Sequence, residues 1–209
     1  MTARGLFTAL GLAVVCLGGL EACSSFPRIV VLHDALTPEE HMSLGASYEA
    51  QGLHETAARQ YQAVLREHGE HAPALIALGN LSFEAGIIQE AEDYYRRALD
   101  AVPDHPGATN NLAMVYLKRG ERLDEAERLA RTAVGQGGVL HPYALDTLAH
   151  IYMRQGRYTE AKTALEEAEA VAPIENLSLR ETLAQSRREL VAAYSQTEGM
   201  GKREHLVTP

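Results

Sequence analysis

The sequence repeats a short pattern with a period close to 34 residues, and this period constrains the fold more than any other feature. Each copy has a leucine, a small residue directly after it, an aromatic residue or its substitute, a glycine and then an alanine. The four copies begin at Leu44, Leu78, Leu112 and Leu148. Such periods are typical of stacked helical hairpins, because one pair of helices cannot bury its apolar face alone. We therefore predict an all-α fold.

Small residues recur at two places in every copy. The residue after the leucine is glycine or alanine, and an alanine follows near the start of the second predicted helix. Small side chains at both places allow the two helices of a hairpin to approach closely. These residues are Gly45 and Ala57, Gly79 and Ala91, Ala113 and Ala126, and Ala149 and Ala161.

This pattern resembles the tetratricopeptide repeat (TPR) family over about residues 38–175. The resemblance implies a right-handed α-solenoid of about four TPR helical hairpins with a C-terminal capping helix. The array covers 37–175, with repeats at 38–71, 72–105, 106–140 and 142–175. The tryptophan often found at the fourth position of this repeat is replaced by His41, Leu75, Thr109 and Leu145.

The third repeat is irregular. It has an extra residue within 121–125, and Ala130 takes the place of an aromatic residue. Three glycines, ending at Gly138, replace the proline that closes the second and fourth repeats. Because glycine is conformationally permissive, we predict that the junction after the third repeat is the loosest in the array.

A capping helix is predicted at 176–195. Ser178 and Glu181 have the spacing of a capping box, in which each side chain bonds the backbone of the other residue. Leu179, Leu183, Leu190 and Tyr194 are expected to face the array. The stretch 196–209 is polar and contains glycine, so we expect a disordered tail.

The N-terminus has the organisation of a secretory signal peptide over 1–22, with Arg4 followed by an apolar run. Leu20-Glu21-Ala22-Cys23 resembles the lipobox of bacterial lipoproteins, in which the cysteine is lipidated and becomes the first residue. Glu21 departs from that pattern, and its effect on processing stays open. The resemblance implies a membrane anchor through lipid on Cys23, followed by a tether at 23–36. The alternative is a plain secretory signal in which Cys23 has no role.

Ser24 follows the cysteine where an aspartate would signal inner-membrane retention in the lipoprotein family. We therefore expect a cell-envelope protein, and in a Gram-negative source an outer-membrane lipoprotein facing the periplasm. Inner versus outer membrane is not otherwise decided by the sequence.

Charge and motifs argue against several classes of function. The chain has 28 acidic and 19 basic residues, a formal charge of −9, whereas nucleic-acid binding needs a basic face. Both cysteines precede the repeats, and His71, His105 and His141 are too far apart in stacked hairpins to share a metal. No nucleophile elbow, phosphate-binding glycine loop or zinc-binding helix motif occurs. We predict no enzyme activity, no metal and no cofactor.

In the TPR family, one face of each first helix lines a concave groove that binds a protein or peptide. Carried to this sequence, the resemblance places a row of apolar residues with a few polar groups in the groove. The amides of Asn80 and Asn110 can pair with a peptide backbone, so we expect an apolar or amphipathic partner segment. The predicted groove residues are Met42, Ala46, Glu49, Ile76, Asn80, Phe83, Asn110, Met114, Leu117, Tyr143, Asp146, His150 and Met153.

Three hypotheses for function follow. The first is a non-enzymatic, lipid-anchored TPR scaffold or adaptor, for example in pilus assembly, secretion and export, or recruitment of peptidoglycan hydrolases or proteases. The second is a structural homo-oligomer of the envelope. The third is an accessory subunit of an envelope enzyme, for which the only indication is His150 one helical turn from Asp146.

Overall fold

The computed structural model describes residues 36–204, and the side chains of residues 36–196. The predicted signal peptide, Cys23 and the tether up to residue 35 lie outside these residues, as do residues 205–209. Within 36–204 every regular element is helical, which confirms the all-α prediction. The elements are α1 (Pro38–Ala50), α2 (His54–Glu67), α3 (Ala72–Glu84), α4 (Ile88–Ala101), α5 (Pro106–Arg119), α6 (Leu123–Gln136), the 3₁₀ turn η1 (Gly138–Leu140), α7 (His141–Arg154), α8 (Tyr158–Val171) and α9 (Leu177–Glu204).

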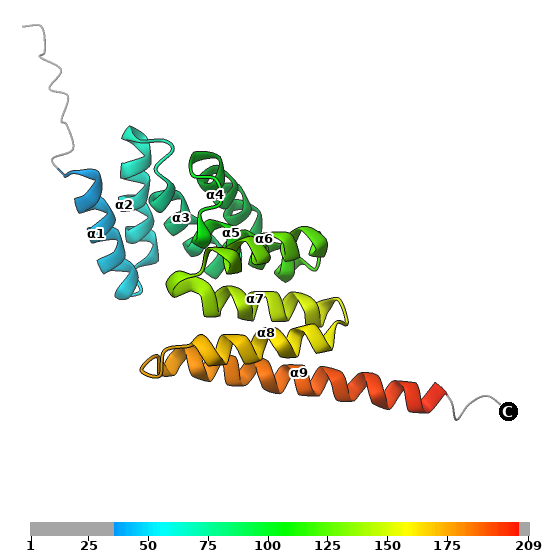
Figure 1. Ribbon diagram of the computed structural model, residues 1–209. Coiled ribbons are helices and arrows are strands. Elements are labelled where there is room, and N and C mark those ends of the chain that lie inside the picture. The colour runs from blue at the N-terminus through cyan, green and yellow to red at the C-terminus, as the bar shows by residue number, and fades with distance from the viewer. Residues whose placement is uncertain (1–35, 205–209) are drawn as a thin grey trace, which may run out of the picture. The chain divides into compact units, whose positions relative to one another are not determined.

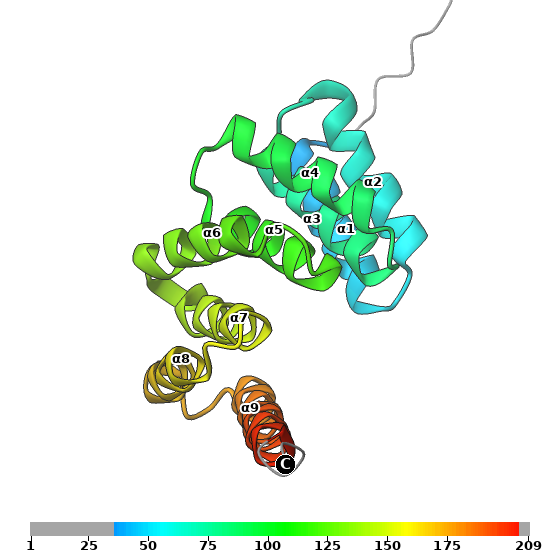
Figure 2. The same ribbon diagram turned by 90° about the vertical axis from the view of Figure 1, so that its right-hand side faces the viewer.

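The helices pair in chain order as four hairpins, α1/α2, α3/α4, α5/α6 and α7/α8. Each hairpin then contacts the next one through its second helix. Figure 1 shows this succession, and Figure 2 shows α7, α8 and α9 lying beside one another at the C-terminal end. The arrangement confirms the predicted α-solenoid. No helix within 36–204 is both long enough and apolar enough to cross a bilayer.

Local sequence explains where the first helices begin. Thr37 and Glu40 form a capping box on α1, since each side chain accepts a hydrogen bond from the other residue's backbone N–H, at 3.2 and 2.7 Å. His71 and His105 cap α3 and α5, where Nδ1 accepts a bond from the backbone N–H three residues later. Two of the three junction histidines therefore satisfy helix N-termini.

Close packing within each hairpin depends on matched residue sizes. A Cβ built on Gly79 would lie 2.5 Å from Cε1 of Tyr95, and one on Gly45 would lie 2.4 Å from Cε1 of Tyr61. In the other two hairpins alanine takes the place of the glycine, and a smaller aliphatic residue takes the place of the tyrosine. The resulting pairs are Gly45/Tyr61, Gly79/Tyr95, Ala113/Ala130 and Ala149/Leu165.

The junction after the third hairpin is more ordered than its glycines suggest. The turn η1 fills it, and Nδ1 of His141 lies 3.0 Å from the carbonyl oxygen of Val134. Across the same junction Arg157 pairs with Glu127 at 2.7 Å. These contacts cross the junction, and its looseness relative to the others stays a prediction.

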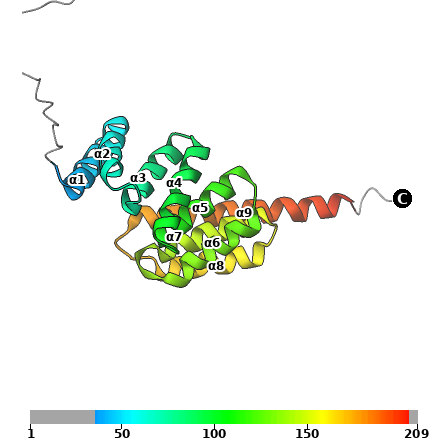
Figure 3. The same cartoon turned by 90° about the horizontal axis from the view of Figure 1, so that it is seen from above.

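Helix α9 differs from the sequence prediction at both ends. Its N-cap is Asn176, whose Oδ1 accepts a bond from the backbone N–H of Leu179 at 3.1 Å, so Ser178 does not cap it. At the other end the helix passes residue 195 and continues to Glu204 (Figures 1 and 3). Extending a formed helix adds one hydrogen bond per residue, so polar helix-forming residues are sufficient to continue it.

The inner face of α9 is largely as predicted. Leu179, Leu183 and Leu190 are buried against the array. Tyr194 is half exposed, and its ring meets that of Tyr158 edge to face at 5.9 Å between centroids. The cap therefore attaches through an apolar stripe, with an ion pair of 2.6 Å between Arg187 of α9 and Glu169 of α8 beside it.

Candidate functional site

Four of the predicted groove residues come together in one open cavity of about 480 Å³. Asn80 and Phe83 come from α3, Met114 from α5 and Tyr143 from α7, so three successive hairpins contribute to it. Glu84, Tyr95 and Asn111 complete its lining. We call this cavity the central groove.

Asn80 is the polar centre of the central groove. Its Oδ1 accepts two hydrogen bonds of 2.8 Å, one from the hydroxyl of Tyr95 and one from Nδ2 of Asn111. Because both bonds need the carbonyl oxygen, the side-chain NH₂ of Asn80 is the remaining polar group. It has no hydrogen-bond acceptor among the described residues. The groove therefore presents an oriented donor surrounded by apolar side chains.

Tyr95 reaches the groove because Gly79 leaves room for its ring. The ring is buried beneath the glycine, and the hydroxyl emerges beside Asn80. Tyr61 behaves in the same way in the first hairpin, where its hydroxyl donates to Oε2 of Glu49 at 2.8 Å. Burial raises the pKa of both phenols well above their usual value. Each hydroxyl therefore stays protonated and donates.

Tyr95 is a groove residue that sequence reasoning missed. The repeat pattern assigns Tyr61 and Tyr95 to hairpin packing alone, because that position is internal. The hydroxyl of Tyr95 nevertheless bonds Asn80, and the residue lines the groove. A signal was nevertheless present: the two hairpins that keep a tyrosine here also keep a glycine opposite it. The aromatic residue, rather than any aliphatic one, brings a polar end to the groove.

The predicted amide of the third hairpin is displaced by one residue. Asn110 is only 7% exposed, and its Nδ2 contacts Sδ of Met114 at 3.6 Å. Its Oδ1 is buried without a hydrogen-bond partner. Asn111, which the prediction did not select, supplies the amide that lines the cavity. On a helix, the side chains of adjacent residues point in directions that differ by about 100°. A shift of one residue is therefore enough to move the amide from the core to the groove.

Lys118 brings a charge to the edge of the central groove. Its Nζ lies 5.3 Å from the centre of the Phe83 ring, within the range of a cation–π contact. Glu84 is exposed on the same helix as Phe83 and also lines the cavity. The apolar floor thus has one acid and one base near its rim.

The other predicted groove residues are separate from this cavity. Ala46 is exposed on α1, and Glu49 is half buried and bonded to Tyr61. Four predicted apolar residues are half buried and pack against the hydrophobic core. They are Met42, Ile76, Leu117 and Met153.

Asp146 and His150 face α9. Nε2 of His150 lies 3.0 Å from Oγ of Ser186, and 3.8 Å from Oδ1 of Asp146. Nδ1 faces Glu189 at 4.0 Å. A hydrolytic triad places the acid and the hydroxyl on opposite ring nitrogens and leaves the hydroxyl accessible. Here Asp146 approaches the same nitrogen as Ser186, and Glu189, at the other nitrogen, is beyond hydrogen-bond distance. Ser186 is also only 2% exposed, so this cluster holds the cap on α7.

Asp146 is expected to make the stability of the cap depend on pH. Burial raises the pKa of its carboxyl above 3.8, against the opposing effects of Ser186 and His150. A carboxyl whose pKa is raised by folding contributes its full stabilisation below pH 3.8, the pKa of the unfolded chain. This contribution is lost as the pH rises through the pKa of the folded protein. Asp146→Asn should therefore raise the midpoint of thermal unfolding at pH 7 but not at pH 3. Thermal unfolding followed by circular dichroism at both pH values checks this, and Asp100→Asn, at an exposed residue, is the control. Equal shifts at both pH values would contradict it.

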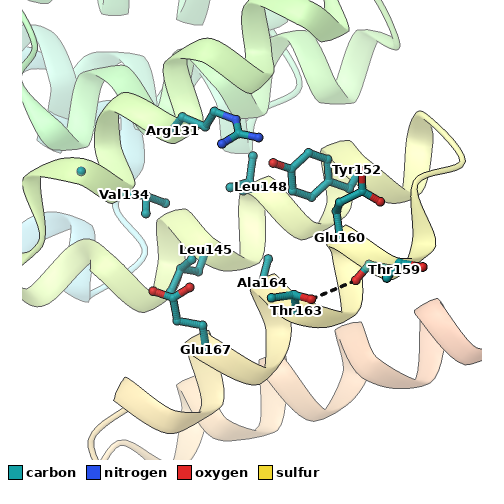
Figure 4. A pocket seen from close by; sticks show the side chains of 11 residues that line it. Arg131, Val134, Leu145, Leu148, Tyr152, Thr159, Glu160, Thr163, Ala164 and Glu167 are labelled. Atoms are coloured by element: carbon teal, nitrogen blue, oxygen red, sulfur yellow. Dashed lines mark hydrogen bonds between the residues drawn. The ribbon is translucent and has the colours of Figure 1, made fainter.

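A second cavity of about 420 Å³ is lined by residues of α6, α7 and α8 (Figure 4). Leu145, Leu148 and Tyr152 form its apolar floor. Each charged group at its rim already has a partner, since Arg131 pairs with Glu127, Glu160 with Arg157 and Glu167 with His141. Unlike the central groove, this cavity contains no side-chain amide among its lining residues.

No cluster of three or more metal-ligating side chains occurs in the part of the chain that the structure describes. The polar groups of the central groove are two amides, two phenols and the carboxylate of Glu84, and the amides and phenols suit hydrogen bonding to neutral groups. The arrangement can hold a polypeptide segment through one backbone carbonyl and apolar side chains.

Comparison with known proteins places these features in a family. Models of the tetratricopeptide repeat match residues 42–106, 82–138 and 142–174. A segment of 84 residues is 36% identical to the probable biofilm formation methyltransferase WspC of Pseudomonas aeruginosa, covering 40% of this chain and 20% of WspC. A segment of 87 residues is 29% identical to tetratricopeptide repeat protein 14 of Mus musculus, covering 42% of this chain and 11% of that protein. The matched segments thus span a fifth or less of these relatives.

Solved structures agree on the fold. A crystal structure of the MamA protein superposes with a TM-score of 0.56 at 16% identity, covering 78% of this chain and 94% of MamA. A tetratricopeptide repeat protein from Parabacteroides merdae ATCC 43184 gives a TM-score of 0.59 at 19% identity, covering 81% of this chain and 66% of that one. With repeat models matching all four hairpins, and structures of this architecture superposing on them, the chain belongs to the tetratricopeptide repeat family.

Proposed function

We propose that this chain is a non-enzymatic scaffold that binds a segment of a partner protein in the central groove. The supporting observation is the free NH₂ of Asn80, which Tyr95 and Asn111 orient from two sides. This donor faces an open cavity, where a partner's backbone carbonyl can replace water as its acceptor.

The lining of the groove favours an extended or amphipathic segment with large apolar side chains. Phe83, Met114 and Tyr143 offer apolar and aromatic contact. Methionine adapts its shape to different side chains, and aromatic residues supply much of the binding energy at interfaces. Asn80 then fixes the register of the segment through its backbone rather than through its side chains.

A photo-crosslinking amino acid at residue 83 tests this proposal in intact cells. We expect one partner protein to be linked at this position. The control carries the same amino acid at Thr163, which is exposed on α8 and lines the second cavity, between α6 and α8. A partner linked equally from both positions, or from Thr163 alone, would contradict binding in the groove.

No enzymatic activity is proposed. The Ser186, His150 and Asp146 cluster lacks the geometry of a nucleophilic triad, as described above. The likeness to a probable methyltransferase covers only 20% of that protein, so we transfer no methyl-transfer chemistry from it. The adaptor role leaves chemistry to the partner.

We further propose that lipid on Cys23 anchors the scaffold in the bacterial envelope, on the outer membrane if the source is Gram-negative. The lipobox-like Leu20-Glu21-Ala22-Cys23 supports this location. An anchored adaptor of this kind fits pilus assembly, export, or recruitment of a peptidoglycan hydrolase or protease.

Cys23→Ser is expected to move the protein from the membrane fraction to the soluble fraction, because several acyl chains are needed for stable anchoring. Immunoblots of fractionated cells and the mass of the mature protein check this. Cys16→Ser is the matched control, since Cys16 lies within the predicted signal peptide. A Cys23→Ser protein that stays in the membrane fraction would contradict the lipid anchor.

A further inference from the structure

Two of the three joints between hairpins contain the same set of four charged and aromatic residues. At the joint between α4 and α5, Glu92 of α4 is paired with Arg96 at 2.7 Å. Tyr116 of α5 accepts hydrogen bonds of 2.9 Å from Arg96 and from Arg122. Arg122, which directly precedes α6, also stacks on the Tyr116 ring at 4.5 Å. Arg119 adds a further ion pair to Glu92 at 2.5 Å.

The joint between α6 and α7 repeats this set. Glu127 of α6 pairs with Arg131 at 3.0 Å and with Arg157 at 2.7 Å. Arg157 directly precedes α8 and lies 4.3 Å from the centre of the Tyr152 ring on α7. The guanidinium carbon of Arg131 also lies over the Tyr152 ring, 5.7 Å from its centre. We call each set a Glu–Arg–Tyr–Arg cluster.

The first joint, between α2 and α3, lacks such a cluster. At the equivalent places it has Ala58, Gln62, Ser82 and Ile87. Ser82 bonds Glu90 within its own hairpin, at 3.2 Å. Within residues 36–204, no ion pair links α2 to α3. This joint therefore depends on apolar contact, with one hydrogen bond of 3.1 Å from Arg97 of α4 to the carbonyl oxygen of Gly69.

The buried apolar residues do not divide at this joint. Those of α2 share one cluster with Ala74, Leu78 and Leu81 of α3. A second cluster joins α3 to α4 and α5, and a third extends from Ala91 on α4 to Leu190 on α9. The polar contacts alone therefore distinguish the first joint from the other two.

The clusters should matter energetically because their carboxylates are shielded from water. The side chains of Glu92 and Glu127 are 6% and 16% exposed. Exposed ion pairs contribute little, whereas hydrogen-bonded pairs with a buried member resist separation, because breaking one leaves a charge without its partner. A joint without such pairs lacks this resistance to rotation.

We propose that the joint between α2 and α3 is a hinge, and that the first hairpin moves relative to a more rigid unit formed by α3 to α9. The hinge carries Met42, Ala46 and Glu49 toward or away from the central groove. The hinge itself stands without the proposed function. Its use, to adjust the groove to the partner segment, rests on that function.

Three equivalent pairs of surface positions measure the three joints separately. Arg59, Asp93, Arg128 and Thr163 occupy the same exposed place on α2, α4, α6 and α8. Spin labels on neighbouring pairs, introduced as cysteines into the full chain with Cys16→Ser and Cys23→Ser, report one joint each. Pulsed electron paramagnetic resonance gives the distribution of each distance. No partner is needed, so failure here is distinguishable from failure of the proposed function.

We expect the distance distribution of the 59/93 pair to be at least about twofold broader than those of the 93/128 and 128/163 pairs. Glu92→Gln should broaden the 93/128 distribution and leave the 128/163 distribution unchanged. Amide hydrogen exchange on each variant identifies any loss of folding, and Glu127→Gln provides the same test at the third joint if Glu92→Gln unfolds. Three distributions of equal width would overturn the hinge.

Discussion

Gly79→Ala is expected to lower the free energy of unfolding by about 2–3 kcal/mol, although it adds only a methyl group. The added carbon would lie 2.5 Å from Cε1 and 2.8 Å from Cδ1 of Tyr95. The ring is buried and held at its hydroxyl by Asn80, so it cannot withdraw without losing that bond. Either the two helices of the hairpin move apart or the tyrosine leaves the groove. Thermal and chemical unfolding measure the cost.

The fourth hairpin suggests how to rescue this variant, because it combines Ala149 with Leu165 at the equivalent places. Adding Tyr95→Leu to Gly79→Ala should reproduce that pair. We expect the double variant to be more stable than the sum of the single costs by about 2 kcal/mol. Purely additive costs would contradict the size-matching account.

Gly135→Ala is the control for the glycine itself. Nothing lies within 4 Å of a Cβ built on Gly135, and its backbone is helical. Removing a glycine from a helix interior should therefore leave the stability unchanged or raise it by about 0.5–1 kcal/mol. The contrast between the two glycines isolates the contact with Tyr95.

Glu92→Gln is expected to destabilise the array by about 2 kcal/mol, since it removes the negative charge that three arginines surround. Glu92 lies 2.7 Å from Arg96, 2.5 Å from Arg119 and 3.6 Å from Arg122. The arginines are partly exposed and regain some hydration, which keeps the cost below that of a fully buried pair. At about 2–4 °C per kcal/mol for a chain of this size, the melting midpoint should fall by roughly 4–8 °C.

Asp93→Asn is the matched control on the same helix, because Asp93 is exposed and contacts only Gln89. It should shift the midpoint by less than about 1 °C. An equal shift for both variants would mean that the cluster around Glu92 contributes no more than an ordinary surface charge. That result would also weaken the hinge proposal.

The sequence predicts the hairpins well because their spacing depends on a few local rules. The period places the helices, the prolines and histidines mark their starts, and glycines allow the turns between them. The positive φ angles of Gly52 and Gly86, 74° and 77°, are examples. These rules act within a few residues of the chain, so one sequence is sufficient to apply them.

The groove was predictable only in part, because its lining depends on small rotations and on contacts between hairpins. Asn80, Phe83, Met114 and Tyr143 were found from position in the repeat. That Asn111 lines the cavity while Asn110 is buried depends on which face α5 turns toward α3. The role of Tyr95 depends on how far its ring extends beneath Gly79. The cover that α9 provides over Asp146 and His150 is likewise a contact between distant parts of the chain.

The sequence also could not show which side chains cross the joints between hairpins. Glycines at 135, 137 and 138 favour flexibility when considered alone. The structure adds an ion pair between Glu127 and Arg157, which lie 30 residues apart in the chain. The width of the 128/163 distance distribution measures which of the two effects is larger at this joint.

The affinity of the chain for the partner that is linked at residue 83 tests the central claim most directly. Phe83→Ala combined with Met114→Ala should weaken binding by about 30-fold in calorimetry, because each truncation removes roughly 1 kcal/mol of apolar contact. Leu53→Ala combined with Ile87→Ala truncates two exposed apolar residues at the hairpin turns, and should bind as the unmodified chain does. Equal affinities for the groove variant and the unmodified chain, with an unchanged melting midpoint, would contradict binding in the central groove.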